Sequence, residues 1–186
     1  MNPKAMRAEE WGDDPKHLGF VLARYKFVSK MLEGYGKVLE VGAADGIASE
    51  VVRRAVGKLL CIDLVPSGMV ESHDILSEPL RGFDAAYALD VIEHIKRKDA
   101  HRFLQNMAKS VRPFKGVVII GSPSLESQRY ASPGSKAEHV NCMTAKELRA
   151  AMLKHFYPVF MFGMNDEVIH CGFDQMRHYN FAIGVR

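Results

Sequence analysis

Residues 87–95, YALDVIEHI, place two carboxylates and an imidazole directly after an apolar run. Glu93 and His94 follow Asp90 by three and four residues, a spacing that puts all three on one side of a helical turn. A neutral imidazole has a pKa near neutrality, so His94 and the neighbouring Glu93 are candidate catalytic residues. Carboxylates and imidazoles also bind divalent metals, and His139 in AEHVNC is a candidate further ligand.

The sequence leaves three interpretations of these residues open. In the first, His94 packs and caps a helix while Glu93 pairs with a nearby base such as Lys96. In the second, His94 is a general base that removes a proton from a substrate hydroxyl. In the third, Asp90, Glu93, His94 and His139 hold Mg²⁺, Mn²⁺, Zn²⁺ or Fe²⁺, and the metal lowers the pKa of the substrate oxygen that it binds.

The elements that must position these residues follow from the apolar pattern, which predicts strands alternating with helices between residues 38 and 120. Strands are expected in KVLEVG, KLLCIDLV, GFDAAYALD and GVVIIGSPS, and helices over residues 18–32, 43–57 and most of 91–113. This alternation predicts an α/β fold with a Rossmann-like, doubly wound, mostly parallel sheet. YPVFMFGM and HYNFAIGVR have no helix between them, which predicts an antiparallel C-terminal strand pair.

The domain organisation is expected to be simple. The 186 residues suit one domain over residues 17–186, after a loose N-terminal segment of residues 1–16. Residues 122–142 and 165–177 are predicted loops, and a helix with a Thr144–Glu147 capping box follows the first of them. Because the carboxyl ends of neighbouring parallel strands meet at one edge of a sheet, the loops that carry His94 and His139 should meet there.

Composition argues against several classes of function. The formal net charge is only +3 and no dense Lys/Arg block occurs, so nucleic acid is an unlikely partner. Three widely spaced cysteines form no CxxC pair, which argues against a zinc cluster and favours a reducing cytoplasm. No apolar run is long enough to cross a membrane, and the N-terminal residues lack a segment of signal-peptide type.

A turn of small residues in VLEVGAADG follows the first predicted strand. Gly42, Ala44 and Gly46 allow the backbone to approach a ligand closely. A phosphate-binding dinucleotide loop would fit this position, but Glu40 and Asp45 would repel a pyrophosphate. The carboxylates instead suit a ligand that carries a positive charge and hydroxyl groups.

Further acids follow the next elements. Asp63 ends the second strand, where a carboxylate accepts hydrogen bonds from ribose hydroxyls. Asp74 in HDIL stands where it could meet an adenine amine, and Ile75 could cover the ring. Together these residues predict an adenosine ligand with a cationic part and no phosphates.

In order and spacing, VLEVGAADG, CID, HDIL and FDAAYALDVIEHI resemble motifs I to IV of the class I S-adenosylmethionine-dependent methyltransferases. The resemblance covers residues 18–186, and its one visible departure is Ala44 at the usual middle glycine. It implies that S-adenosylmethionine is the methyl donor. It also implies a cofactor-binding set in which Glu40, Gly42, Ala44 and Gly46 line the methionine end, Asp63 holds the ribose, Asp74 and Ile75 hold the adenine, and Asp90 lies near the methyl group.

The acid-x-x-Glu-His motif, with His139 ahead of a Thr-capped helix, resembles two branches of this family. These are the small-RNA 3′-end 2′-O-methyltransferases, in which the set binds a metal, and the ubiquinone-pathway O-methyltransferases. Asp90 stands where the RNA enzymes have Glu. We expect methyl transfer to an oxygen of a small-molecule acceptor, a sugar or a metabolite, because a hydroxyl needs the help of a base or metal. The alternatives are 2′-O-methylation of an RNA terminal ribose and a non-catalytic S-adenosylmethionine-binding module.

Overall fold

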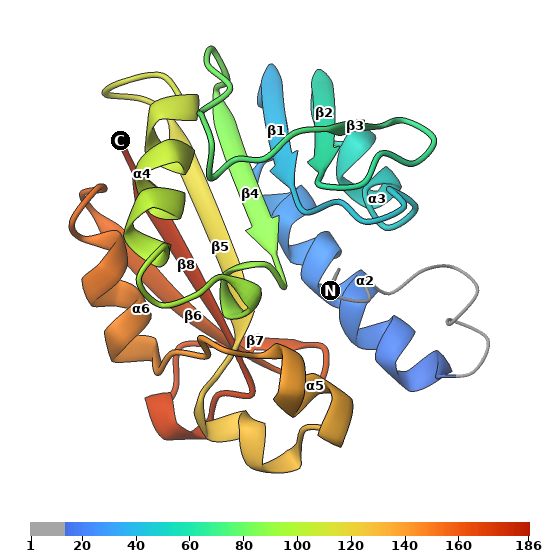
Figure 1. Cartoon of the computed structure of the whole chain (residues 1–186), viewed down its shortest axis with the longest axis vertical. Coiled ribbons are helices and arrows are strands. Elements are labelled where there is room, and N and C mark those ends of the chain that lie inside the picture. The colour runs from blue at the N-terminus through green and yellow to red at the C-terminus, as the bar shows by residue number, and fades with distance from the viewer. Residues whose placement is uncertain (1–13) are drawn as a thin grey trace.

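A mixed β-sheet forms the centre of the computed structural model, which describes residues 14–186 (Figure 1). Within these residues the sheet has eight strands in the order β3-β2-β1-β4-β5-β8-β6-β7. Their bounds are β1 Lys37–Val41, β2 Lys58–Asp63, β3 Val70–Ser72, β4 Ala85–Leu89, β5 Val117–Pro123, β6 Val159–Asn165, β7 Val168–His170 and β8 Tyr179–Val185.

The strand directions confirm the expected fold class. β1 pairs in parallel with β2 and β4, and β3 and β5 extend the parallel part on either side. β8 lies between β5 and β6 and is antiparallel to both, which confirms the antiparallel C-terminal pair. The short strand β7 pairs with β6 at the edge of the sheet, although residues 165–177 were expected to form only a loop.

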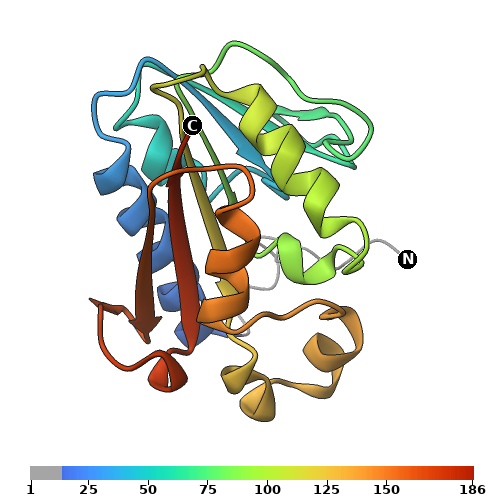
Figure 2. The same ribbon diagram turned by 90° about the vertical axis from the view of Figure 1, so that its left-hand side faces the viewer.

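Helices cover both faces of the sheet, as a doubly wound fold requires (Figures 1 and 2). One face packs against α2 (Pro15–Met31) and α3 (Glu50–Arg53) through a core that contains Val28, Val52 and Val38. The other face packs against α4 (Ala100–Ser110) and α6 (Ala145–Met152), where Leu39 joins the core. Because side chains alternate along a strand, Val38 and Leu39 of β1 belong to opposite cores.

The helix predicted over residues 43–57 is mostly wrong. Only α3 is helical there, because Ala44 and Gly46 have φ angles of 54° and 77° and hold the preceding segment in turns. The helix predicted within residues 91–113 is divided into the 3₁₀ helix η1 (Ile92–His94) and α4, since Ile95 is extended. The predicted loop 122–142 contains the 3₁₀ helix η2 (Glu126–Tyr130) and the short helix α5 (Pro133–Glu138).

The first residues of α6 and α2 can be compared with the helix starts that the sequence predicts. Thr144 and Glu147 form the predicted capping box at the start of α6. Asp14 caps α2 by accepting a hydrogen bond from His17 N, so this helix begins inside the segment expected to be loose. The rest of that segment, residues 1–13, lies outside the described residues. None of the described helices is both long and apolar enough to cross a membrane.

Candidate functional site

The predicted functional residues gather at the carboxyl edge of the parallel strands. The turn at residues 42–46 follows β1, Asp63 ends β2 and Asp90 follows β4. In open α/β sheets this edge is where ligands bind, because the loops after adjacent strands converge there. The fold thus places residues from three strands around one space.

Backbone conformation explains why small residues occupy the turn after β1. Gly42 has a φ of 81°, and a Cβ atom built on it would lie 2.3 Å from Val91 Cγ2. Ala44 has a φ of 54° and donates its N–H to Asp63 Oδ2 at 3.0 Å. The left-handed region is unfavourable for a residue with a Cβ, so Ala44 retains some strain that glycine would relieve. Its hydrogen bond to Asp63 couples the turn to the end of β2.

The carboxylate of Glu40 is buried and already hydrogen-bonded. Its Oε1 accepts a hydrogen bond from Tyr25 Oη at 2.8 Å, and Cys61 Sγ lies 3.4 Å from Oε2. Burial raises the pKa of Glu40, although neighbouring hydrogen-bond donors oppose this shift. Glu40 therefore supports the strand end beneath the turn, and its assignment to the methionine end of the cofactor stays a prediction.

The residues predicted to hold the adenine differ in exposure. Asp74 is exposed, and its Oδ1 accepts a hydrogen bond from Leu76 N at 2.8 Å. Ile75 is only 5% exposed and belongs to the core on the α4 face. Its carbonyl accepts a hydrogen bond from Asn106 Nδ2 at 2.7 Å. Ile75 thus fixes the segment that carries Asp74, and its contact with an adenine ring stays a prediction.

Asp90 pairs with an arginine that the sequence did not single out. Arg24 Nη1 lies 2.8 Å and 3.0 Å from the two carboxylate oxygens of Asp90, and the Arg24 guanidinium lies over the ring of Tyr179. Arg24 follows Val21 by three residues and precedes Val28 by four, so it falls on the apolar face of α2. A lone cationic residue on an apolar helix face was the signal that could have found it.

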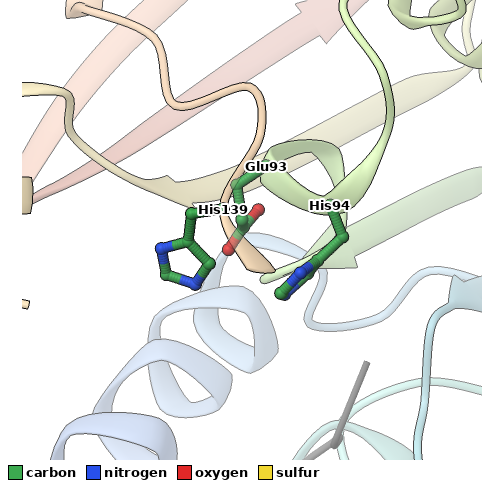
Figure 3. Close-up of side chains that lie close together, drawn as sticks. All are labelled: Glu93, His94 and His139. Atoms are coloured by element: carbon green, nitrogen blue, oxygen red, sulfur yellow. The ribbon is translucent and has the colours of Figure 1, made fainter. Parts of the chain in front are cut away.

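Glu93, His94 and His139 form the compact centre of the site (Figure 3). One ligand atom from each residue can be chosen so that all three lie within 4.8 Å of one another. Figure 3 shows the carboxylate of Glu93 between the two histidines. The structure thus brings together three of the four candidate metal ligands, whereas the fourth, Asp90, is paired with Arg24 and lies outside this set.

Glu93 has an unusual environment for a carboxylate. It is 0% exposed, and neither of its carboxylate oxygens has a hydrogen-bond partner within residues 14–186. Burial raises its pKa well above the ordinary value and the nearby charge of Asp90 adds to this effect, whereas Arg24 and the nearby Ser122 side chain oppose it. A buried carboxyl group without partners costs stability, so its position calls for a ligand that supplies charge or donors.

Each imidazole is oriented through its Nδ1 atom. His139 Nδ1 lies 3.0 Å from Gln128 Oε1, and His94 Nδ1 lies 3.3 Å from the carbonyl oxygen of Glu138. Both neighbours are acceptors, so the proton of each neutral ring belongs on Nδ1 and leaves the Nε2 lone pair free. Burial and the nearby His94 lower the pKa of His139, which favours its neutral form.

Backbone contacts bring the two halves of this cluster together. Asn141 N donates to the carbonyl of Glu93 at 2.9 Å, and Asn141 Nδ2 donates to the carbonyl of Ile92 at 3.2 Å. Ile92 is buried in the core and anchors η1 at the end of β4. These bonds attach the segment after α5, which carries His139, to the turn that carries Glu93 and His94.

The family of the chain follows from a comparison with known proteins. A family model described as a methyltransferase domain matches residues 10–155. The chain belongs to this family. It is therefore a class I S-adenosylmethionine-dependent methyltransferase with the Rossmann-like fold of that class. None of the curated protein sequences matches it significantly.

Solved structures share the fold of this methyltransferase at low sequence identity. A methyltransferase from Archaeoglobus fulgidus is 16% identical with a TM-score of 0.72, over 96% of this chain and 97% of that chain. A putative methyltransferase solved with the Haloferax volcanii activator Trm112 is 14% identical with a TM-score of 0.67, over 97% and 99%. The methyltransferase domain of bacterial CtHen1-C is 16% identical with a TM-score of 0.68, over 90% and 98%.

Proposed function

We propose that this methyltransferase transfers the methyl group to an oxygen of a small-molecule acceptor, and that Glu93, His94 and His139 hold a divalent cation beside that oxygen. One observation carries the proposal. Glu93 is fully buried, both of its oxygens lack partners among the described residues, and two imidazole nitrogens lie within 4.8 Å of it. A carboxylate in this position is stabilised by a cation that the two histidines also bind.

The donor set supports a first-row transition metal. Oxygen-only sites suit Mg²⁺, whereas one carboxylate with two imidazoles suits Zn²⁺, Mn²⁺ or Fe²⁺. The Nδ1 contacts of His94 and His139 resemble the outer hydrogen bonds that orient metal-bound histidines. When bound, such a cation would lower the pKa of a hydroxyl on the acceptor and favour its deprotonation.

Arg24 and Asp90 suit the methionine end of S-adenosylmethionine. This end carries an ammonium and a carboxylate, and the Arg24–Asp90 pair offers the complementary charges. Asp90 follows β4 and Arg24 belongs to α2, and Val91, next to Asp90, packs against Gly42 in the turn after β1. We assign the cofactor ammonium to Asp90 and the cofactor carboxylate to Arg24. Asp63, at the end of β2, is assigned to the ribose hydroxyls.

The protein residues would position the two reactants in line. Methyl transfer with inversion requires the acceptor oxygen to approach the methyl group opposite the sulfur, so orientation contributes much of the rate. Asp90 and Glu93 are three residues apart on the same turn after β4. This spacing places the cofactor residues next to the acceptor residues. With the cation bound, the Nε2 lone pair of His94 is a metal ligand and the acceptor proton leaves to solvent; His94 takes that proton only if no cation binds.

Two alternatives predict different behaviour. If an RNA terminal ribose is the acceptor, the basic run after Glu93 would bind the RNA phosphates. However, Arg97 and Arg102 in that run pair with Glu147 and Asp99. These ion pairs reduce the free positive charge available to phosphates, so we favour a small acceptor. A non-catalytic module would bind S-adenosylmethionine without turning over any acceptor.

The proposal is tested by measuring S-adenosylhomocysteine release with a panel of sugars, vicinal diols and small amines, each with Mn²⁺ or Zn²⁺ and again with EDTA. Methylation of a vicinal diol also makes it resistant to periodate, which identifies oxygen as the acceptor atom. We expect turnover that requires the cation and is lost in Glu93→Gln, while S-adenosylhomocysteine binding persists. Turnover that EDTA leaves unchanged would contradict the metal, and turnover restricted to amines would contradict oxygen transfer.

The panel includes a short RNA with a free 3′-terminal ribose. Turnover of this RNA alone, with a steep dependence on salt concentration, would favour the RNA alternative over a small acceptor. S-adenosylmethionine binding without turnover of any acceptor would favour the non-catalytic module.

A further inference from the structure

A separate cleft lies at the same end of the sheet as the proposed metal site. It has a volume of about 230 Å³ and is lined by residues of η2, of η3 (Asp174–Met176) and of the end of β6. Figures 1 and 2 show η2 and the segment that contains η3 side by side at this end. Pockets for complete small molecules usually measure about 300–1,000 Å³, so this cleft suits one group of a larger ligand.

A buried arginine in the cleft wall has unused hydrogen-bond donors. Arg177 is 4% exposed, and among residues 14–186 neither Nε nor Nη1 has a hydrogen-bond partner. Only its Nη2 is engaged, with Asp174 Oδ1 at 2.8 Å and with the carbonyl of Gly172 at 3.4 Å. Asp174 is largely exposed, whereas the guanidinium that it pairs with is buried. Asp174 is the ionic partner of this guanidinium, and the two remaining N–H groups call for further hydrogen-bond acceptors, such as phosphate oxygens.

A histidine lies beside this arginine. His170 Nδ1 accepts a hydrogen bond from Gly172 N at 3.2 Å, so the proton of the neutral ring belongs on Nε2. His170 Nε2 is buried and has no partner in the described part of the chain. A Cβ atom on Gly163 would lie 2.5 Å from Arg177 Cγ and 2.8 Å from His170 Cε1. Glycine at this position therefore lets both side chains cross β6 together.

Two arginines and one carboxylate line the cleft. Arg129 and Arg177 both line it, and the Arg129 guanidinium stacks on the neighbouring Tyr130 ring at 4.6 Å. Glu126 is the acid among the lining residues, and its buried Oε2 lacks a partner within the described residues. The arginine N–H groups need acceptors, and the Glu126 carboxylate needs a donor. A ligand with an anionic group and an adjacent hydroxyl supplies both, because the arginines donate to the anion and Glu126 accepts from the hydroxyl.

The element η2 connects this cleft to the proposed metal site. Gln128 of η2 contacts His139 Nδ1 at 3.0 Å, while Glu126, Arg129 and Tyr130 of the same element line the cleft. A ligand held in the cleft is thus next to the element that orients His139. We propose that the cleft binds a phosphate group of the methyl acceptor, so that the acceptor is a phosphate ester with free hydroxyls. This inference rests on the proposed methyl transfer.

The test measures phosphate binding directly. Inorganic phosphate is titrated into the full chain at constant ionic strength in EDTA, so that the metal site does not contribute, and amide chemical shifts are followed by NMR. We expect Arg129→Gln to weaken phosphate affinity at least tenfold, in keeping with the size of charge-assisted hydrogen bonds. The matched control Arg149→Gln makes the same exchange at an exposed position of α6 and should leave the affinity unchanged.

A second variant keeps the test independent of one surface charge. Arg177→Gln should also weaken phosphate binding at least tenfold, and its folding is verified by its melting temperature and by S-adenosylhomocysteine binding. Equal phosphate affinity in the wild type, Arg129→Gln and Arg149→Gln would overturn the inference. If the wild type binds phosphate but does not bind S-adenosylhomocysteine, the proposed methyl transfer is refuted instead.

Two further ligands distinguish the source of the phosphate. Ribose 5-phosphate represents a small acceptor, with ribose as its phosphate-free control, and a five-nucleotide RNA represents a polymer. Binding of ribose 5-phosphate that depends on Arg129 and exceeds that of ribose would support a sugar phosphate as acceptor. Dependence on Arg129 for the RNA alone would keep the phosphate site but assign it to the backbone of a nucleic acid. Either ligand binding equally well to Arg129→Gln would count against the cleft.

Discussion

Adding metal should reverse the order of stability of the wild type and the Glu93→Gln variant. Glu93 is fully buried, and its oxygens have no hydrogen-bond partner among the described residues. Leaving a buried polar group unsatisfied costs about 1–3 kcal/mol, and more when it is charged. Without metal, the wild type must also protonate a buried carboxylate whose pKa is raised, and the neutral amide of Glu93→Gln avoids that cost, so the variant should melt at an equal or higher temperature than the wild type.

With metal, the wild type should become the more stable protein. A free Mn²⁺ or Zn²⁺ concentration about 100 times the Kd stabilises the folded state by about 2.7 kcal/mol. For a domain of this size, that energy corresponds to a rise in melting temperature of roughly 5–11 °C. Glu93→Gln loses the carboxylate ligand, so most of the rise should disappear and the order of the two melting temperatures should reverse.

The assay is thermal unfolding followed by circular dichroism, in EDTA and in a series of metal concentrations. Glu71→Gln provides a matched control, because Glu71 is exposed on β3 and the same exchange should change neither melting temperature. A wild type whose melting temperature is unaffected by every divalent cation tested would refute the reasoning. An equal metal-dependent rise in wild type and Glu93→Gln would refute it as well.

The remaining predictions concern the cofactor residues and a surface histidine pair. Arg24→Ala should weaken S-adenosylhomocysteine binding at least tenfold by calorimetry, yet leave binding of 5′-methylthioadenosine unchanged, because that analogue lacks the carboxylate assigned to Arg24. Asp63→Ala should weaken both ligands alike, since both contain the ribose, and unequal losses would contradict the assignment. His155 hydrogen-bonds to His101, and burial with the nearby His101 lowers its pKa below 6.5. The unfolded chain thus gains a proton as pH falls through 6.5 before the folded chain does, so urea unfolding should show stability decreasing from pH 7.5 to 5.5. His155→Asn should flatten this decrease, and an unchanged slope would contradict the assignment.

The parts of the fold that were predicted correctly have strong local signals. Apolar runs of four to six residues bounded by glycine, proline or acidic residues gave the parallel strands, and the Thr144–Glu147 pair gave the start of α6. The meeting of Glu93, His94 and His139 followed from topology, because loops after adjacent parallel strands share one edge. Their chemical roles stay predictions until they are measured.

The parts that were missed depend on contacts between distant segments. The apolar residues of 43–57 have helical spacing, but the positive φ angles at Ala44 and Gly46 keep most of that segment in turns. Arg24 was not singled out, because its partner Asp90 is 66 residues away in the sequence. Arg177 gave no sequence signal, since its burial depends on Gly163 of β6 leaving space for it.

Metal content tests the central claim most directly. The full chain is purified without chelator and without a metal-affinity tag, dialysed, and analysed for elements beside calorimetry with S-adenosylhomocysteine. The account predicts about one equivalent of a transition metal in the wild type, less than a tenth of that in His139→Ala, and cofactor binding in both. Cofactor binding with no metal, even after Mn²⁺, Zn²⁺ or Fe²⁺ is added, would contradict the metal site and leave His94 as a simple base or a packing residue.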